Sequence, residues 1–166
     1  MALNQVTERG LHVIKQWERF RARPYHDGGT VKSIGFGHSS QLESYPFDEN
    51  SEWTTDFAHD VLRGDLEYFG NLMLPHLKVE VPDSIWSICL SLSYNKGVGR
   101  LVRSDNWKIL HDGGEYHLER FCESILTYAT QAPNKITGEM EEKRGLRWRR
   151  IAEAGLYLQD RSPDYL

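Results

Sequence analysis

One stretch of the chain, ERFRARPYHDGGTVKSIGFGH at residues 18–38, has a composition unlike that of the segments on either side of it. Before it, the apolar residues within 4–20 recur at helical intervals and predict a first helix that ends near Arg21. Pro24 disfavours a helical backbone in the residue before it. The turn signal and the glycine-rich, partly β-branched run that follow predict a small β-hairpin or three-stranded sheet over about residues 24–45.

Beyond this stretch, the apolar spacing predicts helices almost throughout, with no internal repeat and no low-complexity linker. Thr54 or Thr55 is the expected N-cap of the first long helix. The next helix is apolar on nearly every side, which indicates a buried central helix that Gly97 and Gly99 stop. The expected helices cover about residues 54–77, 85–94, 104–111, 115–130 and 138–159. The sequence therefore predicts an α+β fold that is predominantly α, with one β excursion near the N-terminus.

The composition fits one ordinary globular domain, because 39% of its 166 residues are hydrophobic. The 20 Lys and Arg against 24 Asp and Glu give a net charge of −4, which argues against nucleic-acid binding through bulk charge. Cys89 and Cys122 lie in apolar segments and are expected to be reduced core residues. Residues 1–15 carry no pattern of a secretory signal or membrane anchor, so we expect synthesis and folding in the cytosol.

Two carboxylic acids within the 18–38 stretch have unlike surroundings. Glu18 lies beside Trp17 and Phe20, and aromatic neighbours favour the protonated form of a carboxyl by desolvation. Asp27 lies in a polar, glycine-flanked turn, which keeps a carboxylate ionised. One acid of each kind is what acid/base hydrolysis of a glycosidic bond requires.

The spacing within this stretch resembles the active-site signature of the phage-type lysozymes, glycoside hydrolase family 24. That signature has a Glu, eight residues, an Asp, five residues and then T-I-G-x-G-H, and all three spacings hold from Glu18 to His38. Residues 90–99 resemble the family's central helix with its N-x-G-x-G end, and residues 145–158 resemble its last helix, G-L-x-x-R-R-x-x-E-x-x-L. The resemblance implies a two-lobed fold in one domain, 1–166. A small β-containing lobe of about 22–50 would face a helical lobe of about 54–166 plus the N-terminal helix.

The family's catalytic roles fall on three residues of this chain. By resemblance, Glu18 is the general acid that protonates the glycosidic oxygen, and Asp27 is the carboxylate that positions or activates water. Ser33 stands where the family usually has Thr and would orient that water, although a serine has a less restricted rotamer. The reaction implied is inverting, which requires a carboxyl separation of about 6.5–9.5 Å. A second departure is Arg19, where the family commonly has Gly.

Other residues of the matching segments have both a functional and a plain structural interpretation. Ser39, Tyr94 and Asn95 match positions that line the family's cleft, and each is either a sugar contact or a packing or capping residue. Gly37 either lets the backbone come close to a sugar or only shapes a bend in the strand. His38 is expected to be a structural histidine bonded to a buried carboxylate rather than a ligand of a metal, because no third ligand recurs at metal spacing. We expect no metal and no cofactor.

Residues 143–150 concentrate five positive charges in a chain that is net acidic. They are either an electrostatic handle on an anionic wall or membrane surface, or a solvated helix face paired with Glu139, Glu141 and Glu142. Trp148 is either a sugar-stacking residue or, as we expect, part of a buried helix face.

The resemblance implies a muramidase that cleaves the β-1,4 bond between N-acetylmuramic acid and N-acetylglucosamine in peptidoglycan, as phage or prophage endolysins do. Such an enzyme would be a monomer made in the host cytoplasm, and a holin pore would let it reach the wall. The alternatives are a lytic transglycosylase, which uses one Glu and no activated water, and a non-catalytic wall-binding relative. An ionisable Asp27 with a hydroxyl at Ser33 speaks against the lytic transglycosylase, and the intact acid pair speaks against the non-catalytic relative.

Overall fold

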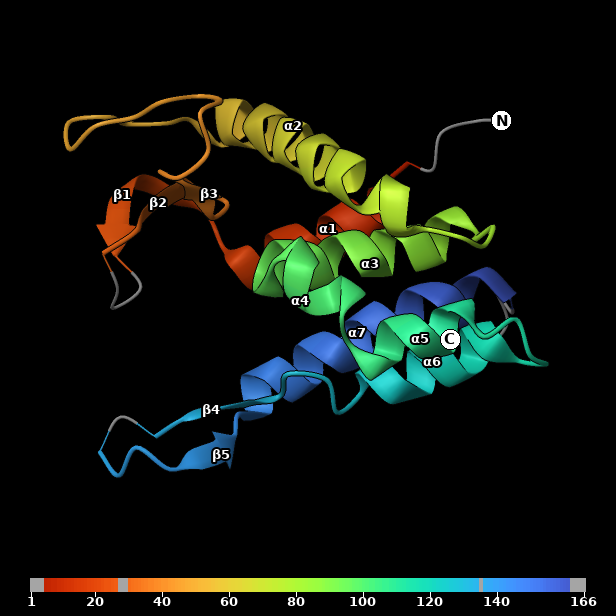
Figure 1. Ribbon diagram of the computed structural model, residues 1–166. Helices are drawn as coiled ribbons and strands as arrows, with labels where there is room; N and C mark the ends of the chain where they lie inside the picture. Colours follow the sequence, from red (N-terminus) through yellow and green to blue (C-terminus); the bar gives the residue numbers. More distant parts are fainter. Residues whose placement is uncertain (1–4, 27–29, 135, 162–166) are drawn as a thin grey trace.

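The computed structural model describes residues 5–26, 30–134 and 136–161. Helices make up most of this part of the chain, and two small antiparallel sheets lie at its periphery (Figure 1). The elements in chain order are α1 (Glu8–Glu18), β1 (Arg21–His26), β2 (Lys32–Gly35), β3 (His38–Ser39), α2 (Thr55–Met73), the 3-10 turn η1 (Leu74–His76), α3 (Asp83–Lys96), α4 (Val98–Val102), α5 (Asp105–His111), α6 (His117–Ile125), β4 (Gln131–Pro133), β5 (Met140–Glu142) and α7 (Arg144–Arg161).

Helix α1 leads directly into the first sheet. Thr7 caps the helix by accepting a hydrogen bond from the backbone N–H of Gly10 at 2.9 Å. The helix ends at Glu18, three residues before the expected end, because Arg19 adopts φ 56° and ψ 138° and turns the backbone into β1. The sheet has the order β1-β2-β3 with antiparallel neighbours, which confirms the predicted three-stranded sheet.

Helix α3 forms the centre of the helical body, as its apolar sequence predicts. It packs against α1, α2, α4 and α7, and its residues from Ser84 to Ser93 are all buried. Helix α2 is capped by Thr54, one of the two expected residues, and gives way to η1 at Leu74, one residue before Pro75. The helical body therefore encloses its core around a helix with no solvent-facing side over most of its length.

Two elements differ from the expectations. Gly97, at φ 83°, ends α3 as expected, but Gly99 lies inside α4 instead of stopping the chain. The hairpin β4–β5 replaces the first turns of the expected 138–159 helix, so the expectation of a single β excursion is wrong. Its strands contain no β-branched residue, and its turn is fixed by the Asn134 side chain, which accepts hydrogen bonds from the N–H groups of residues 136 and 137.

Both cysteines are free and buried, which confirms that they are reduced core residues. Burial raises the pKa of the Cys122 thiol to about 12 and that of the Cys89 thiol further still. No helix within the described ranges is both long and apolar enough to cross a lipid bilayer.

Candidate active site

The Glu18 carboxyl lies at the junction between α1, the β2–β3 turn and the helical body. Its side chain is 18% exposed, so part of it reaches solvent. One oxygen, Oε2, faces Gly37, where a Cβ atom would lie 3.2 Å from it. Gly37 also has φ +87°, a conformation that side-chain-bearing residues rarely adopt. Glycine at position 37 is therefore favoured both by the backbone and by the close approach of the carboxyl.

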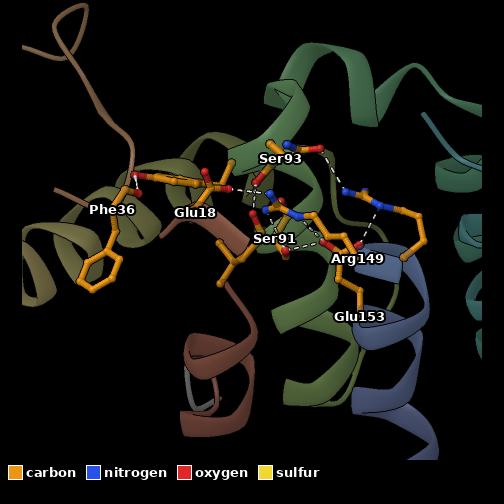
Figure 2. A network of polar contacts seen from close by, with 10 residues as sticks. Glu18, Phe36, Ser91, Ser93, Arg149 and Glu153 are labelled. Carbon is orange, nitrogen blue, oxygen red and sulfur yellow. Dashed lines mark hydrogen bonds and ion pairs between the residues drawn. The ribbon is translucent and has the colours of Figure 1, made fainter. Parts of the chain in front are cut away.

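The other oxygen of Glu18 meets a guanidinium from the far end of the chain. Arg149 of α7 places its Nη1 2.7 Å from Oε1 of Glu18, and the Arg149 side chain is only 5% exposed (Figure 2). An ion pair so little exposed to water is screened less than a surface pair. Arg149 therefore fixes the orientation of the Glu18 carboxyl.

The guanidinium of Arg149 belongs to a buried network that joins α7 to α3 (Figure 2). Its Nε donates to Oε1 of Glu153 at 3.1 Å, and Ser91 donates to the same oxygen at 2.5 Å. The second carboxyl oxygen of Glu153 lies 3.1 Å from Nε of Arg150, whose Nη2 donates to Oδ1 of Asn95 at 3.0 Å. Burial raises the pKa of the Glu153 carboxyl, and the two guanidiniums oppose that shift.

Neither interpretation of the basic segment 143–150 holds for all of it. Lys143 and Arg147 pair with Glu141 and Glu142 near the surface, as the solvated-face interpretation predicts. Arg149 and Arg150 are buried instead, which the sequence does not predict. The expectation that Trp148 is buried is wrong, because it is 56% exposed. The packing of α7 on α3 turns this face of the helix inward and leaves Trp148 outside.

A second buried pair supports the β2–β3 turn. Nδ1 of His38 lies 2.9 and 3.0 Å from the two carboxyl oxygens of Asp65 on α2, and both side chains are buried. This confirms the expected structural histidine bonded to a buried carboxylate. The sequence contains an indication of a buried role for Asp65, because this acid lies within the apolar stripe of α2, next to Leu66.

Tyr94 of α3 ties the same turn to the helical body. Its hydroxyl lies 3.1 Å from the carbonyl oxygen of Phe36 and 3.3 Å from Oδ2 of Asp65, and it donates to one of them. Burial raises the pKa of the Tyr94 hydroxyl well above its ordinary value, and the Asp65 carboxylate adds to the shift. The hydroxyl therefore stays protonated and serves the fold at this position.

The remaining candidate residues lie on the sheet and at the end of α3. Ser33 occupies the central strand β2, half-buried, opposite Tyr25 on β1 and Ser39 on β3. The Ser39 hydroxyl accepts from the backbone N–H of residue 41 at 3.2 Å, and Oδ1 of Asn95 accepts from Arg150. Asp27, the second expected catalytic carboxylate, lies outside the described residues.

The chain is similar to known proteins over most of its length. The family model described as phage lysozyme matches residues 15–153. The endolysin of Bacillus phage B103 is 29% identical over 159 residues, which cover 95% of this chain and 55% of that protein. The endolysin of Acyrthosiphon pisum secondary endosymbiont phage 1 is 24% identical over 152 residues, covering 92% of this chain and 97% of that protein. The chain spans about half the length of the Bacillus phage relatives it matches.

Solved structures share the fold over nearly the whole chain. The muramidase domain of SpmX from Asticaccaulis excentricus has a TM-score of 0.79 at 20% identity, covering 93% of this chain and 98% of that one. The endolysin from Escherichia coli O157:H7 phage FAHEc1 has a TM-score of 0.77 at 24% identity, covering 94% of each chain. These likenesses confirm the predicted fold class, and the family model confirms the resemblance first seen in residues 18–38. The chain belongs to the phage lysozyme family.

Proposed function

We propose that this protein is a muramidase that hydrolyses the β-1,4 bond between N-acetylmuramic acid and N-acetylglucosamine in peptidoglycan. The observation that carries the proposal is the Glu18 carboxyl, which is partly exposed and is held through one of its oxygens by Arg149. Gly37 leaves room for one of its oxygens, and Arg149 lies 2.7 Å from the other. A proton donor fixed in this way meets the positional requirement of general acid catalysis. Family membership and the endolysin names of the relatives support the same activity.

In the proposed mechanism, Glu18 donates its proton to the glycosidic oxygen as the bond to the anomeric carbon breaks. Asp27 accepts a proton from a water molecule, which attacks the anomeric carbon from the opposite face of the sugar. Ser33 orients that water through its hydroxyl, and the positive charge that develops at the sugar carbon is stabilised by the Asp27 carboxylate. The anomeric configuration inverts in this scheme.

Acid variants test the assignment. Glu18→Gln and Asp27→Asn keep the size of each side chain but remove the proton donor and the base, so each is expected to clear permeabilised Gram-negative cells at least about a hundredfold more slowly than wild type. Glu139→Gln is the matched control, because Glu139 is exposed and lies in the β4–β5 turn region. Equal clearing by wild type and Glu18→Gln would remove the proposed mechanism.

Product analysis separates hydrolysis from the transglycosylase alternative. A muramidase leaves reducing N-acetylmuramic acid ends, whereas a lytic transglycosylase leaves 1,6-anhydro ends. Proton NMR of the first products gives the anomeric outcome, and the proposed mechanism predicts the α-anomer. Anhydro ends would instead favour the lytic transglycosylase.

The endolysin names of the relatives support a role in host lysis. In that role the protein is a monomer, with residues 1–166 as one domain of two unequal lobes, made in the host cytoplasm and released to the wall through a holin. Expression in a bacterial host with and without a co-expressed holin tests this, since lysis should need both. Light scattering coupled to size-exclusion chromatography tests the monomer.

A further inference from the structure

Glu153 is the most deeply buried acid near the site, and its two oxygens serve different partners. One accepts from Arg149 and Ser91, and the other lies beside Arg150 (Figure 2). The side chains of Glu153 and Arg150 are both 0% exposed. Glu153 thus links the Arg149 guanidinium, which contacts Glu18, to Ser91 on α3 and to Arg150.

Fold stability alone is a weak reason for this arrangement. Removing two guanidiniums and a carboxylate from water carries a desolvation penalty, and well-packed apolar residues in such places often give equal or greater stability. The network does, however, orient the Arg149 guanidinium toward Glu18. Arg149 uses Nε for Glu153 and Nη2 for the carbonyl and hydroxyl oxygens of Ser91, which leaves Nη1 facing Glu18.

We infer that Glu153 is a positioning residue for the reaction, which holds Arg149 against the Glu18 carboxyl and compensates the positive charge that Arg149 and Arg150 bring to the site. The inference rests on the proposed function, in which Glu18 is the proton donor. Glu153 acts only through Arg149, because no contact joins Glu153 to Glu18 within the described residues.

The charges around Glu18 are mainly positive. Among the described residues, the charged and titratable groups that interact with Glu18 include Arg149 and Arg150 from α7 and Tyr94 and Lys96 from α3. Three of these four are cations, and Glu153 is the acid that offsets two of them. A neutral residue at position 153 leaves more uncompensated positive charge at the site. The activity profile should therefore shift to lower pH.

The direct test is Glu153→Gln, which keeps the size of the side chain and an acceptor for Ser91 but removes the charge. We expect kcat on solubilised peptidoglycan to fall at least about tenfold, because a misplaced catalytic carboxyl is poorly tolerated. KM should stay within about twofold, and the alkaline limb of the pH–kcat profile should move to lower pH. Unchanged kcat and an unchanged pH profile would overturn the inference.

A matched control separates positioning from loss of stability. Leu156→Ala removes a buried residue of the same helix that takes no part in the network, and it is expected to lower the melting temperature without moving the pH profile. If Leu156→Ala moves the profile as Glu153→Gln does, the shift reports loosening of α7 and the inference fails. If Glu153→Gln does not fold, Ser91→Ala replaces it. That variant weakens the same attachment and is expected to lower kcat about threefold at constant KM; a wild-type kcat would count against Glu153.

A double-mutant cycle shows whether Glu153 acts through Arg149. In an Arg149→Gln background, Glu153→Gln should lower kcat by less than about twofold, because the group that it positions is gone. Full additivity of the two losses would refute the route through Arg149. An inactive Glu18→Gln together with a fully active Glu153→Gln removes this inference alone, whereas an active Glu18→Gln removes the proposed function itself.

Discussion

The two oxygens of the Glu18 carboxyl face unlike parts of the molecule. On one side is the β2–β3 turn, where Gly37 has no side chain and the His38–Asp65 pair supports the backbone. On the other side is α7, where Arg149 is held by Glu153. On the turn side, Gly37 leaves space for the carboxyl because it has no side chain. On the α7 side, buried ion pairs fix the position of the carboxyl. We therefore expect substitutions on the α7 side to cost more stability, because removing a charged partner there leaves a buried charge with fewer compensating groups.

The largest effect is expected at the α7 side. Glu153→Ala removes the carboxylate that two buried guanidiniums share, which leaves Arg150 without its acid partner and Arg149 with Glu18 alone. It should lower the free energy of unfolding by about 3–5 kcal/mol. Urea denaturation followed by tryptophan fluorescence measures it. Glu142→Ala is the control, since the Glu142 carboxylate pairs with Arg147 near the surface and its loss should cost about 0–1 kcal/mol. Similar losses in the two variants would mean that the buried network contributes no more than a surface pair.

Support of the turn side is expected to be weaker. Asp65→Ala removes the acceptor for His38 and one acceptor for Tyr94, and should lower the free energy of unfolding by roughly 2 kcal/mol. Asp60→Ala on the same helix is the matched control, because the Asp60 carboxyl is largely exposed and lies 3.7 Å from His59. If Asp65→Ala destabilises more than Glu153→Ala does, the ranking of the two sides is reversed.

A substitution at Gly37 tests the contribution of the turn side to catalytic activity. Gly37→Ala places a Cβ atom 3.2 Å from Oε2 of Glu18 and strains a backbone at φ +87°, so we expect kcat to fall about tenfold. Gly113→Ala is a close control: it has φ +65°, but its Cβ meets no atom within 4 Å. Both variants should lose about 1 kcal/mol of stability. Only Gly37→Ala should lose activity, and a comparable loss in Gly113→Ala would mean that strain alone lowers the rate.

Gly37 and Arg149 also show why one side of the site could be predicted from sequence and the other could not. A glycine at positive φ reflects the conformation of its own short segment. The sequence motif from Glu18 to His38 is therefore enough to single it out. The burial of Arg149 depends on how α7 docks on α3, and a helix with five positive charges in eight residues is typical of a solvated face. The second sheet is not predicted for a related reason: β4 and β5 contain no strand-forming residue types, and their pairing accompanies a turn in which the Asn134 side chain accepts hydrogen bonds.

The smallest effect is expected at Arg19, between the two sides. Arg19 has φ 56° and ψ 138°, a region that suits glycine, and it is exposed. Arg19→Gly should therefore raise the free energy of unfolding by about 1 kcal/mol, measured by urea denaturation, because relief of strain exceeds the added freedom of the unfolded chain. Arg103→Gly, an exposed arginine at φ −94°, should lower it by about 0.5 kcal/mol instead. A loss of stability in Arg19→Gly would show that the Arg19 side chain contributes more than its backbone conformation costs. The turn into β1, and with it the position of Glu18 between Gly37 and Arg149, would then depend on that side chain as well.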